Sequence, residues 1–468
     1  TLEWVGLFPG KRESRRFNGL YTLTQQDVIN QSTHYDAVAY GGWAIDLHPA
    51  DGVYAGGNGC HQWHSKGVYQ IPYRCYVTPD LDNLFVGGRI ISSSHVANGT
   101  TRVMCTSALG GEVIGRAASI CLSKGYKPID LVDRDRIGLL QSLLVKNGNF
   151  IPGIAVAVED NLADSAEISV SSVLELDDLP ADGTWFGLDY PIAQLIPVNG
   201  KVPVVRMNVK ADNATRLVME LRSSSKSENY TPDTIDAVLE FDLKKDENEI
   251  VADFSYSYAT PRYAFICLMK NPEISVPMSG RLVTGLTAVY NYINPAVSNF
   301  GKQVPPEGIG VEEFEFWCPK RRPESKNIAM SFAPSLASFN SENLRNSYYR
   351  PYIGTNAWVA AFDDARPEVC FKWNGRKQIK TIILYFDTDT DQAMETVQMG
   401  HFDACVPTCY REYIIRDSEG KELYHITGNH QTLNVLELDQ PVTTDAIYVN
   451  FVRPCGDVCP GLMGVYVC

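Results

Sequence analysis

The sequence predicts an α+β protein of several domains, with helices in its first third and β-sandwiches after them. Three observations lead to this fold class. The 468 residues suffice for about three domains of ordinary size. Residues 82–119 read as a short buried strand, a glycine turn and a helix. Between residues 154 and 320, short alternating segments are separated by Asp, Asn, Gly and Pro clusters, which is typical of a β-sandwich.

Composition excludes some classes of function. The formal net charge is -14, which argues against binding nucleic acid or an anionic membrane. The sequence lacks an apolar run of about eighteen residues, so it predicts no transmembrane helix. The first ten residues do not have the pattern of a signal peptide.

The most informative stretch is residues 82–119. We expect a strand over Leu84–Val86, a turn at Gly87 and Gly88, a polar loop, and a helix from about Thr101. The start of a helix offers unpaired N–H groups and positive dipole character. It therefore suits an anionic or electron-rich ligand edge, although the glycines alone also fit an ordinary strand, turn and helix.

Residues 83–119 resemble a conserved stretch of the FAD-dependent oxidoreductases of the glutathione-reductase type, in a branch common in Bacteroidetes. The resemblance implies FAD as cofactor, with the helix start facing the pyrimidine edge of its isoalloxazine ring. Glu112 and the pair Gly115-Arg116 depart from the family pattern, so the middle of the helix matches less well than its start. The residues that this resemblance assigns to cofactor binding are Gly87, Gly88, Arg89, Gly99, Arg102, Val103 and Met104.

Two further segments, residues 41–49 and 67–74, resemble those that line the substrate side in this family. Hydride loss from a carbinol needs a base for the hydroxyl proton and donors for the forming carbonyl. Histidine titrates in the right range, so His48 and His95 are the candidate bases, although a lone histidine is more often structural. Tyr73 and Arg74 complete the predicted catalytic set. The predicted substrate contacts are Arg12, Arg15 and Trp43.

The nucleotide fingerprint Gly-x-Gly-x-x-Gly does not follow a strand anywhere in the sequence. We therefore expect the chain to be the C-terminal portion of a longer polypeptide, or to work with a second chain that carries the nucleotide-binding half.

The twelve cysteines are unevenly placed. Cys60, with His61 and His64, lacks a fourth partner for a metal, and we expect no metal there. The pairs Cys405/Cys409 and Cys455/Cys459 favour disulfides in an exported protein, while a zinc site and free thiols stay open.

The predicted domain limits are 1–130 for part of the FAD and substrate domain, 131–153 for a linking helix, 154–322 for a β-sandwich, and 323–468 for a second sandwich. Residues 323–468 resemble the discoidin-like or galactose-binding-like (F5/8 type C) jelly rolls, several of which bind carbohydrate. The resemblance implies sugar contacts from loop aromatics, with Trp358, Tyr348, Tyr349 and Tyr352 as candidates, and Trp358 equally suited to the core. The middle sandwich is either a spacer or a further carbohydrate-binding module.

The favoured function is transfer of a hydride from a carbinol or sugar-like substrate to FAD, in a periplasmic or secreted protein. The alternative is a non-enzymatic carbohydrate-binding protein that uses the C-terminal jelly roll. The expected partner is a small molecule and not a nucleic acid.

Overall fold

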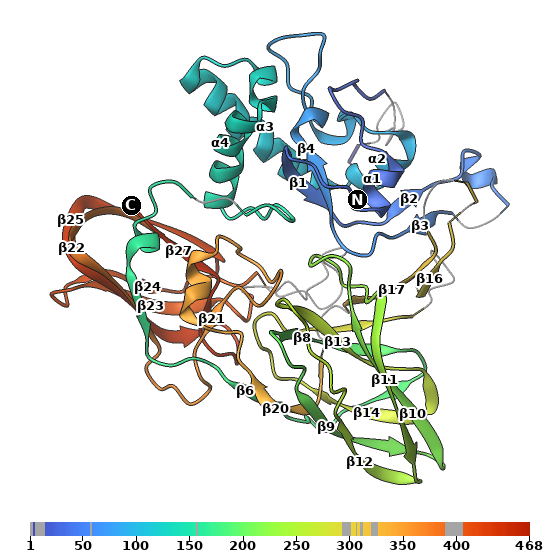
Figure 1. Cartoon of the computed structure of the whole chain (residues 1–468). Helices are drawn as coiled ribbons and strands as arrows, with labels where there is room; N and C mark the ends of the chain where they lie inside the picture. The colour runs from blue at the N-terminus through green and yellow to red at the C-terminus, as the bar shows by residue number, and fades with distance from the viewer. Residues whose placement is uncertain are drawn as a thin grey trace. The chain divides into compact units, whose positions relative to one another are not determined.

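The computed structural model describes residues 3–4, 15–56, 59–155, 158–292, 301–305, 307–308, 312–319, 326–388 and 406–468. The chain divides into two compact units (Figure 1). Unit 1 comprises residues 1–144 and 306–311, and unit 2 comprises residues 145–305 and 312–468. Helices dominate unit 1 and strands dominate unit 2, which is the predicted α+β multidomain class. Two residues singled out above, Arg12 and Cys405, lie outside the described ranges.

In its described residues, unit 1 combines helices α1 to α3 and most of α4 with small antiparallel sheets. Strand β1 pairs with β4, and β2 pairs with β3. The bounds are α1 Gln25–Ile29, α2 His95–Thr101, α3 Met104–Lys124, α4 Arg134–Lys146, β1 Ala37–Gly41, β2 Ile45–Leu47, β3 His61–Trp63 and β4 Tyr69–Pro72, with 3-10 turns η1 Gly52–Tyr54, η2 Tyr73–Cys75, η3 Gly88–Ile90 and η4 Pro128–Val132.

Local sequence signals explain where the helices begin. Thr24 caps α1 in a reciprocal capping box with Asp27. Ser94 caps α2 by accepting a hydrogen bond from the backbone N–H of Ala97. The helix predicted from about Thr101 is present as α3, which begins at Met104. The polar loop predicted before it is wrong in part, because α2 occupies residues 95–101 and the helical path breaks at Arg102 and Val103. The predicted strand at residues 84–86 is reduced to one isolated bridge, between Val77 and Phe85.

The first part of unit 2 is a sandwich of two antiparallel sheets. One sheet has the order β11-β10-β13-β8-β15-β18, and the other has the order β19-β14-β9-β20-β6, with β12 beside β9 and β7 beside β14. The bounds are β6 Leu176–Leu179, β7 Trp185–Leu188, β8 Ile192–Val198, β9 Val204–Ala211, β10 Thr215–Ser223, β11 Thr234–Leu243, β12 Asp246–Ala252, β13 Arg262–Leu268, β14 Asn271–Ser279, β15 Ala288–Tyr290, β18 Cys318–Pro319, β19 Asn327–Ile328 and β20 Met330–Leu336. A separate hairpin pairs β16 Gly301–Gln303 with β17 Phe314–Phe316.

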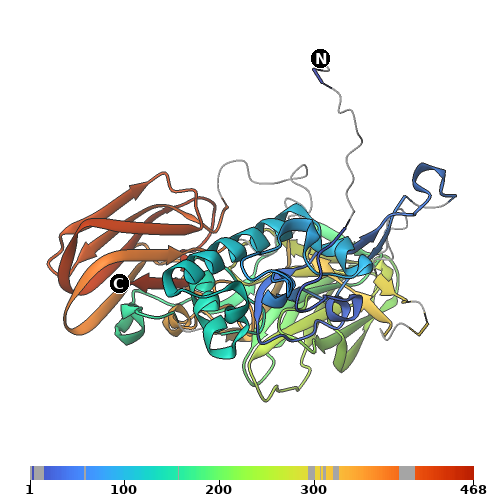
Figure 2. The same cartoon turned by 90° about the horizontal axis from the view of Figure 1, so that it is seen from above.

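The C-terminal sandwich is built on two long strands, β22 Glu368–Tyr385 and β25 Leu433–Pro454. Their pairing is irregular between Lys372 and Lys377, and the two halves of β22 have different outer neighbours, β5 and β27. The orange and red strands form two facing layers (Figure 2). The remaining bounds are η5 Leu162–Ser165, β5 Glu167–Val170, η6 Ser341–Arg345, β21 Trp358–Val359, β23 Tyr410–Asp417, β24 Glu422–Thr427, β26 Gly461–Leu462 and β27 Gly464–Val467.

Strand pairing in unit 2 crosses the predicted domain limits. Strand β5, from the predicted middle domain, pairs with β22 of the C-terminal sheet. Strand β20, from the predicted C-terminal domain, pairs with β6 and β9 of the middle sandwich. The two sandwiches therefore exchange chain segments.

Trp358 belongs to the core of the C-terminal sandwich. It is fully buried, packs near Phe451 and donates from Nε1 to the carbonyl oxygen of Ser172 at 2.9 Å. Of the two roles left open for it, the structure supports the core role. Sugar contact would need an exposed ring face, which this residue does not have.

Candidate functional site

The start of helix α3 carries no side-chain cap. Its N-cap residue, Val103, has no hydroxyl, carboxyl or amide to accept a backbone N–H. Met104, the first helical residue, is 88% exposed, and Cys105 after it is also exposed. A 21-residue helix therefore presents unsatisfied N–H groups and its positive dipole end at an accessible position.

Just before this helix start, Arg102 takes part in a three-residue polar cluster with Asp46 and His48. Arg102 Nη2 donates to the carbonyl oxygen of Asp46 at 3.0 Å and lies 3.7 Å from its carboxylate Oδ2. His48 Nε2 lies 3.2 Å from the same Oδ2, and His48 Nδ1 lies 3.0 Å from the carbonyl oxygen of Gly59. One carboxylate thus holds a guanidinium and an imidazole together.

Glycine and threonine in α2 set the position of this cluster. A Cβ at Gly99 would lie 3.1 Å from both the backbone N and O of Asp46, so only glycine allows α2 this close to β2 without displacement. Next to it, Thr100 Oγ1 donates to the carbonyl oxygen of Trp43 at 2.6 Å. The helix therefore fixes the segment from Trp43 to Asp46 through its backbone.

The predicted glycine turn is present and is attached to both helices. Gly88 has φ +66°, a conformation that favours glycine. A Cβ at Gly87 would lie 2.6 Å from Cδ1 of Ile114 on α3. Asn98 Nδ2 of α2 donates to the carbonyl oxygen of Arg89 at 3.0 Å. These contacts bring the predicted cofactor-binding residues of the turn and of the two helices into one region.

Among the residues that the structure describes, four buried oxygens in this region have no hydrogen-bond partner: Asp46 Oδ1, Ser93 Oγ, Thr101 Oγ1 and Ser107 Oγ. Buried polar atoms are normally paired, so unpaired ones indicate a ligand or water. Together with the uncapped α3, they fit the polar edge of a flavin ring, which needs donors and can accept or donate at several atoms. The fit concerns the ring end of FAD, since the fingerprint for its ADP end does not occur in the 468 residues.

Tyr73 and Arg74 have structural partners, and we remove them from the catalytic set. Tyr73 is fully buried and donates its hydroxyl to the carbonyl oxygen of Pro128 at 2.8 Å, and burial raises its pKa. Arg74 forms a bidentate ion pair with Asp36, in which Nε donates to Oδ2 and Nη2 donates to Oδ1, each at 2.9 Å. That hydrogen bonding raises the pKa of Arg74.

The other predicted residues lie at the surface or partly so. His48 and His95 are exposed, and His95 is the first residue of α2. Arg15 is exposed, and Trp43 is half-buried. None of these placements tests a substrate role, which stays a prediction.

The sequence interpretation singled out neither Asp46 nor Asp36, the carboxylates that pair with Arg102 and Arg74. Asp46 had a local signal, its position two residues before the candidate base His48, although β2 ends at Leu47 and does not include His48. Asp36 had none, since its partner Arg74 lies 38 positions away in the sequence.

In the part of the chain that the structure describes, no three His, Cys, Asp or Glu residues are placed to hold a metal ion. Cys455 is disulfide-bonded, whereas Cys409 and Cys459 are free thiols. Burial raises the pKa of Cys409 to about 11 and that of Cys459 to about 12, so both stay protonated at neutral pH. Among the described helices, none is both long and apolar enough to cross a membrane.

Solved structures similar to part of this chain are carbohydrate-binding modules. Chitosan-binding module 1 of a chitosanase/glucanase from Paenibacillus sp. IK-5 is 11% identical, with a TM-score of 0.21 over 28% of this chain and 86% of the module. The family 32 module of C. perfringens NanJ, in complex with galactose, is 10% identical, with a TM-score of 0.22 over 28% and 85%. Likeness at this level carries no argument about the fold or ligand of this chain.

The comparison with protein families is specific for unit 1. No curated protein matches the chain. Residues 1–144 match the family described as FAD dependent oxidoreductase, and FAD is the cofactor of that family. The matched range contains the uncapped helix start, the glycine turn and the Asp46 cluster. The first 144 residues of this chain are therefore similar to the FAD dependent oxidoreductase family.

Proposed function

We propose that this chain supplies the flavin-ring and substrate-facing part of an oxidoreductase that removes a hydride from a carbinol or sugar-like substrate. The observation that carries the proposal is the uncapped start of α3, with unpaired buried oxygens around it, inside the range matched by the family. Bound FAD supplies the hydride acceptor.

The role of α3 and Arg102 is to hold negative charge. The guanidinium of Arg102 belongs to the residue two positions before Met104, where α3 and its free N–H groups begin. Both groups favour a bound anion. Both are in position before a ligand binds, since the N–H groups belong to the helix and Arg102 contacts the backbone and the carboxylate of Asp46. This arrangement supports stabilisation of charge on the reduced ring.

His48 and His95 are the candidate groups to accept or hold the proton of the substrate hydroxyl. Each ring nitrogen of His48 faces an oxygen acceptor, an arrangement that satisfies the protonated imidazole. His48 is therefore suited to holding a proton beside Asp46. His95, exposed at the start of α2, is the candidate to accept the hydroxyl proton at a ring nitrogen.

The ADP end of the cofactor requires a nucleotide-binding half outside these 468 residues, on an upstream segment or a second chain. We also propose a periplasmic or secreted location. The disulfide at Cys455 supports it, because disulfides persist in oxidising compartments.

The test is a visible absorption spectrum of the protein purified from its native source, with the released cofactor identified by mass. Bound FAD, and bleaching of its visible band on addition of a sugar alcohol or aldose under anaerobic conditions, are the expected results. Protein that stays colourless after incubation with FAD and with any co-purifying chain would contradict the proposal. It would favour the non-enzymatic carbohydrate-binding alternative.

A further inference from the structure

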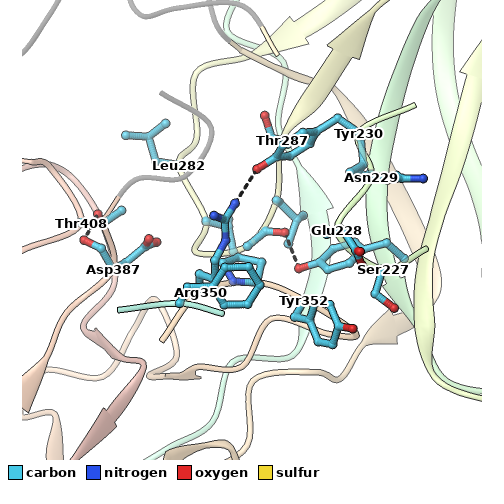
Figure 3. Close-up of a pocket in the computed structure, with 17 residues that line it drawn as sticks. Ser227, Glu228, Asn229, Tyr230, Leu282, Thr287, Arg350, Tyr352, Asp387 and Thr408 are labelled. Atoms are coloured by element: carbon cyan, nitrogen blue, oxygen red, sulfur yellow. Dashed lines mark hydrogen bonds between the residues drawn. The ribbon is translucent and has the colours of Figure 1, made fainter. Parts of the chain in front are cut away.

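Two cavities in unit 2 differ in how much space they leave for a ligand. The cavity around Arg350 and Glu228, shown in Figure 3, has a volume of about 50 Å³, which is room for a few water molecules. A groove on the middle sandwich has a volume of about 330 Å³, which suits a small organic molecule. The groove is therefore the better candidate for a binding site.

The groove lies on the outer face of one sheet of the middle sandwich. Four strands of that sheet contribute its polar residues, which are Asp178 on β6, Asn208 on β9, Glu247 on β12 and Ser331 on β20. Asp178 and Ser331 are cross-strand neighbours. The residues on either side of Asn208 along β9 are both buried, so Asn208 itself faces away from the core.

Trp185 of β7 supplies an aromatic ring to the groove, and it is 38% exposed. The ammonium nitrogen of Lys210 lies 4.0 Å from the centre of this ring and 3.3 Å from Oε1 of Glu247. An aromatic face and a carboxylate are two groups that recognise an organic ammonium ion. The groove therefore already holds an ammonium group, that of the protein's own lysine.

The charge around the groove favours a cation. Among the described residues that line it, Asp178 and Glu247 are acidic and none is Lys or Arg. Residues 1–144 contain nearly equal numbers of basic and acidic residues, so the net charge of -14 belongs almost entirely to the residues that follow them. We therefore expect the surface around the groove to attract cations and repel anions.

The internal cations leave the groove open to exchange. Glu247 pairs with Lys210, and Asp178 pairs with Arg281 at 3.3 Å. All four side chains are partly exposed, and ion pairs of this kind contribute little to stability. Because Lys210 has a flexible stem of four carbons, its ammonium can leave Trp185 and Glu247 when another ammonium replaces it.

We propose that this groove binds a small molecule that carries a protonated primary amine. The ligand ammonium takes the place of the Lys210 ammonium between Trp185 and Glu247, and Asn208 and Ser331 offer hydrogen bonds to the rest of the molecule. Two sources share this chemistry, an amino sugar and an aliphatic diamine, and the groove is large enough for either. The site does not rest on the proposed oxidoreductase function.

The test is isothermal titration of the full chain with D-glucosamine and with putrescine, at about pH 6, where primary amines are protonated. N-Acetyl-D-glucosamine and 1,4-butanediol are the matched neutral probes. We expect at least one amine to bind with a Kd in the millimolar range or below, about tenfold more tightly than its neutral partner, and to bind more weakly as salt is added. Tighter binding of D-glucosamine identifies an amino sugar, and tighter binding of putrescine identifies a diamine.

Three variants test the placement of the ligand. Glu247→Gln and Trp185→Leu each remove a group that contacts the ammonium, so each should raise Kd about three- to tenfold. Lys210→Met removes the internal competitor and should lower Kd about threefold. The matched control is Glu240→Gln, an exposed glutamate of β11 that pairs with Arg216 at 2.7 Å and does not line the groove. It should leave Kd unchanged.

Absence of saturable binding by both amines overturns the proposal, and so does equal binding of each amine and its neutral partner. A Kd that Lys210→Met raises or leaves unchanged also overturns it, because the ligand would then not compete with that ammonium. An equal effect of Glu240→Gln and Glu247→Gln would mean attraction by net charge alone, without a site. These variants leave the visible spectrum of FAD unchanged, so failure here and failure of the oxidoreductase proposal are distinguishable.

Discussion

Unit 1 contains two Arg–Asp pairs near the predicted site, and they differ in how completely they are satisfied. Asp36 is fully buried, and both its oxygens receive hydrogen bonds from the guanidinium of Arg74, with a third bond from the Arg74 backbone N–H. Asp46 keeps one buried oxygen unpaired and holds Arg102 at 3.7 Å from the other. The carboxylate of Asp36 therefore uses its hydrogen-bonding capacity within the fold, whereas that of Asp46 can accept a further hydrogen bond.

The surroundings of the two pairs agree with this difference. Arg74 lies over the rings of Tyr21 and Tyr35, with its guanidinium carbon 5.0 and 5.1 Å from their centres. Arg102 instead directly precedes the uncapped start of α3. A fully satisfied pair in an aromatic setting is typical of a structural role, and we propose a ligand-binding role for the incompletely satisfied pair at the open helix end.

The largest expected effect comes from breaking the satisfied pair. Asp36→Ala leaves Arg74 partly buried without its carboxylate, so we expect the N-terminal unit to lose about 3–5 kcal/mol of stability. Hydrogen exchange of the amides in β1 and β4 measures this locally, without assuming that the whole chain unfolds in one step.

The control is Glu112→Gln, which breaks the half-exposed pair with Arg116 on α3. We expect a change of less than about 1 kcal/mol there. Equal losses for Asp36→Ala and Glu112→Gln would mean that the buried pair has no special structural role.

Next in size is the effect of Arg102 on the flavin. In protein reconstituted with FAD, Arg102→Gln removes a cation beside the proposed ring site, which disfavours the negatively charged reduced form. A charged hydrogen bond is worth about 1.5–3 kcal/mol, so we expect the two-electron midpoint potential to fall by about 30–60 mV. Spectroelectrochemical titration measures it.

Arg116→Gln, further along the same helix, is the matched control and should leave the potential unchanged. An unchanged potential for Arg102→Gln as well would place Arg102 away from the reacting ring.

The same pairs show what the sequence could predict. The N-cap residue Thr24 and the amphipathic pattern of α4 can be recognised in the sequence, because caps and helical periodicity act over a few residues. The resemblance drew attention to Arg74 and Arg102 equally. Only tertiary pairing, over 38 positions for Arg74 and 56 for Arg102, separates a structural arginine from one available to a ligand.

Long-range pairing also explains the remaining differences. Residues 167–170 read as a strand of the middle sandwich because alternation reveals a strand but not its neighbour. Their partner lies about two hundred positions later, in β22.

A smaller effect on stability is expected at Gly99, whose close contact with Asp46 positions the Asp46–Arg102 pair. Gly99→Ala places a Cβ 3.1 Å from the Asp46 backbone, and the resulting displacement of β2 should outweigh the gain of about 1 kcal/mol in helix propensity. We expect a net loss of about 1 kcal/mol in the stability of α2 and weaker FAD binding.

Gly111→Ala in α3 meets nothing within 4 Å and is the matched control. It should gain up to about 1 kcal/mol from propensity alone. Hydrogen exchange in α2 and α3 compares the two. A stabilising Gly99→Ala would show that the contact with β2 is not tight.

The smallest effect extends the comparison to a pair nearer the surface, Asp182 with Lys326 of the middle sandwich, at 2.7 Å. Burial alone would raise the pKa of Asp182, but hydrogen bonds from Lys326 and Thr184 lower it to about 2. Since the folded pKa lies below the unfolded value of about 3.9, the pair stabilises the fold above about pH 4 and loses this contribution as the pH falls toward 2.

Asp182→Asn should therefore cost less than about 1 kcal/mol at pH 7, and the difference from the parent protein should shrink toward zero near pH 2. Urea denaturation at pH 7, 4 and 2.5 measures both, and Lys326→Met should reproduce the loss at pH 7. A difference that persists at pH 2.5 would mean that the Asp182 hydrogen bonds, and not its charge, carry the stabilisation.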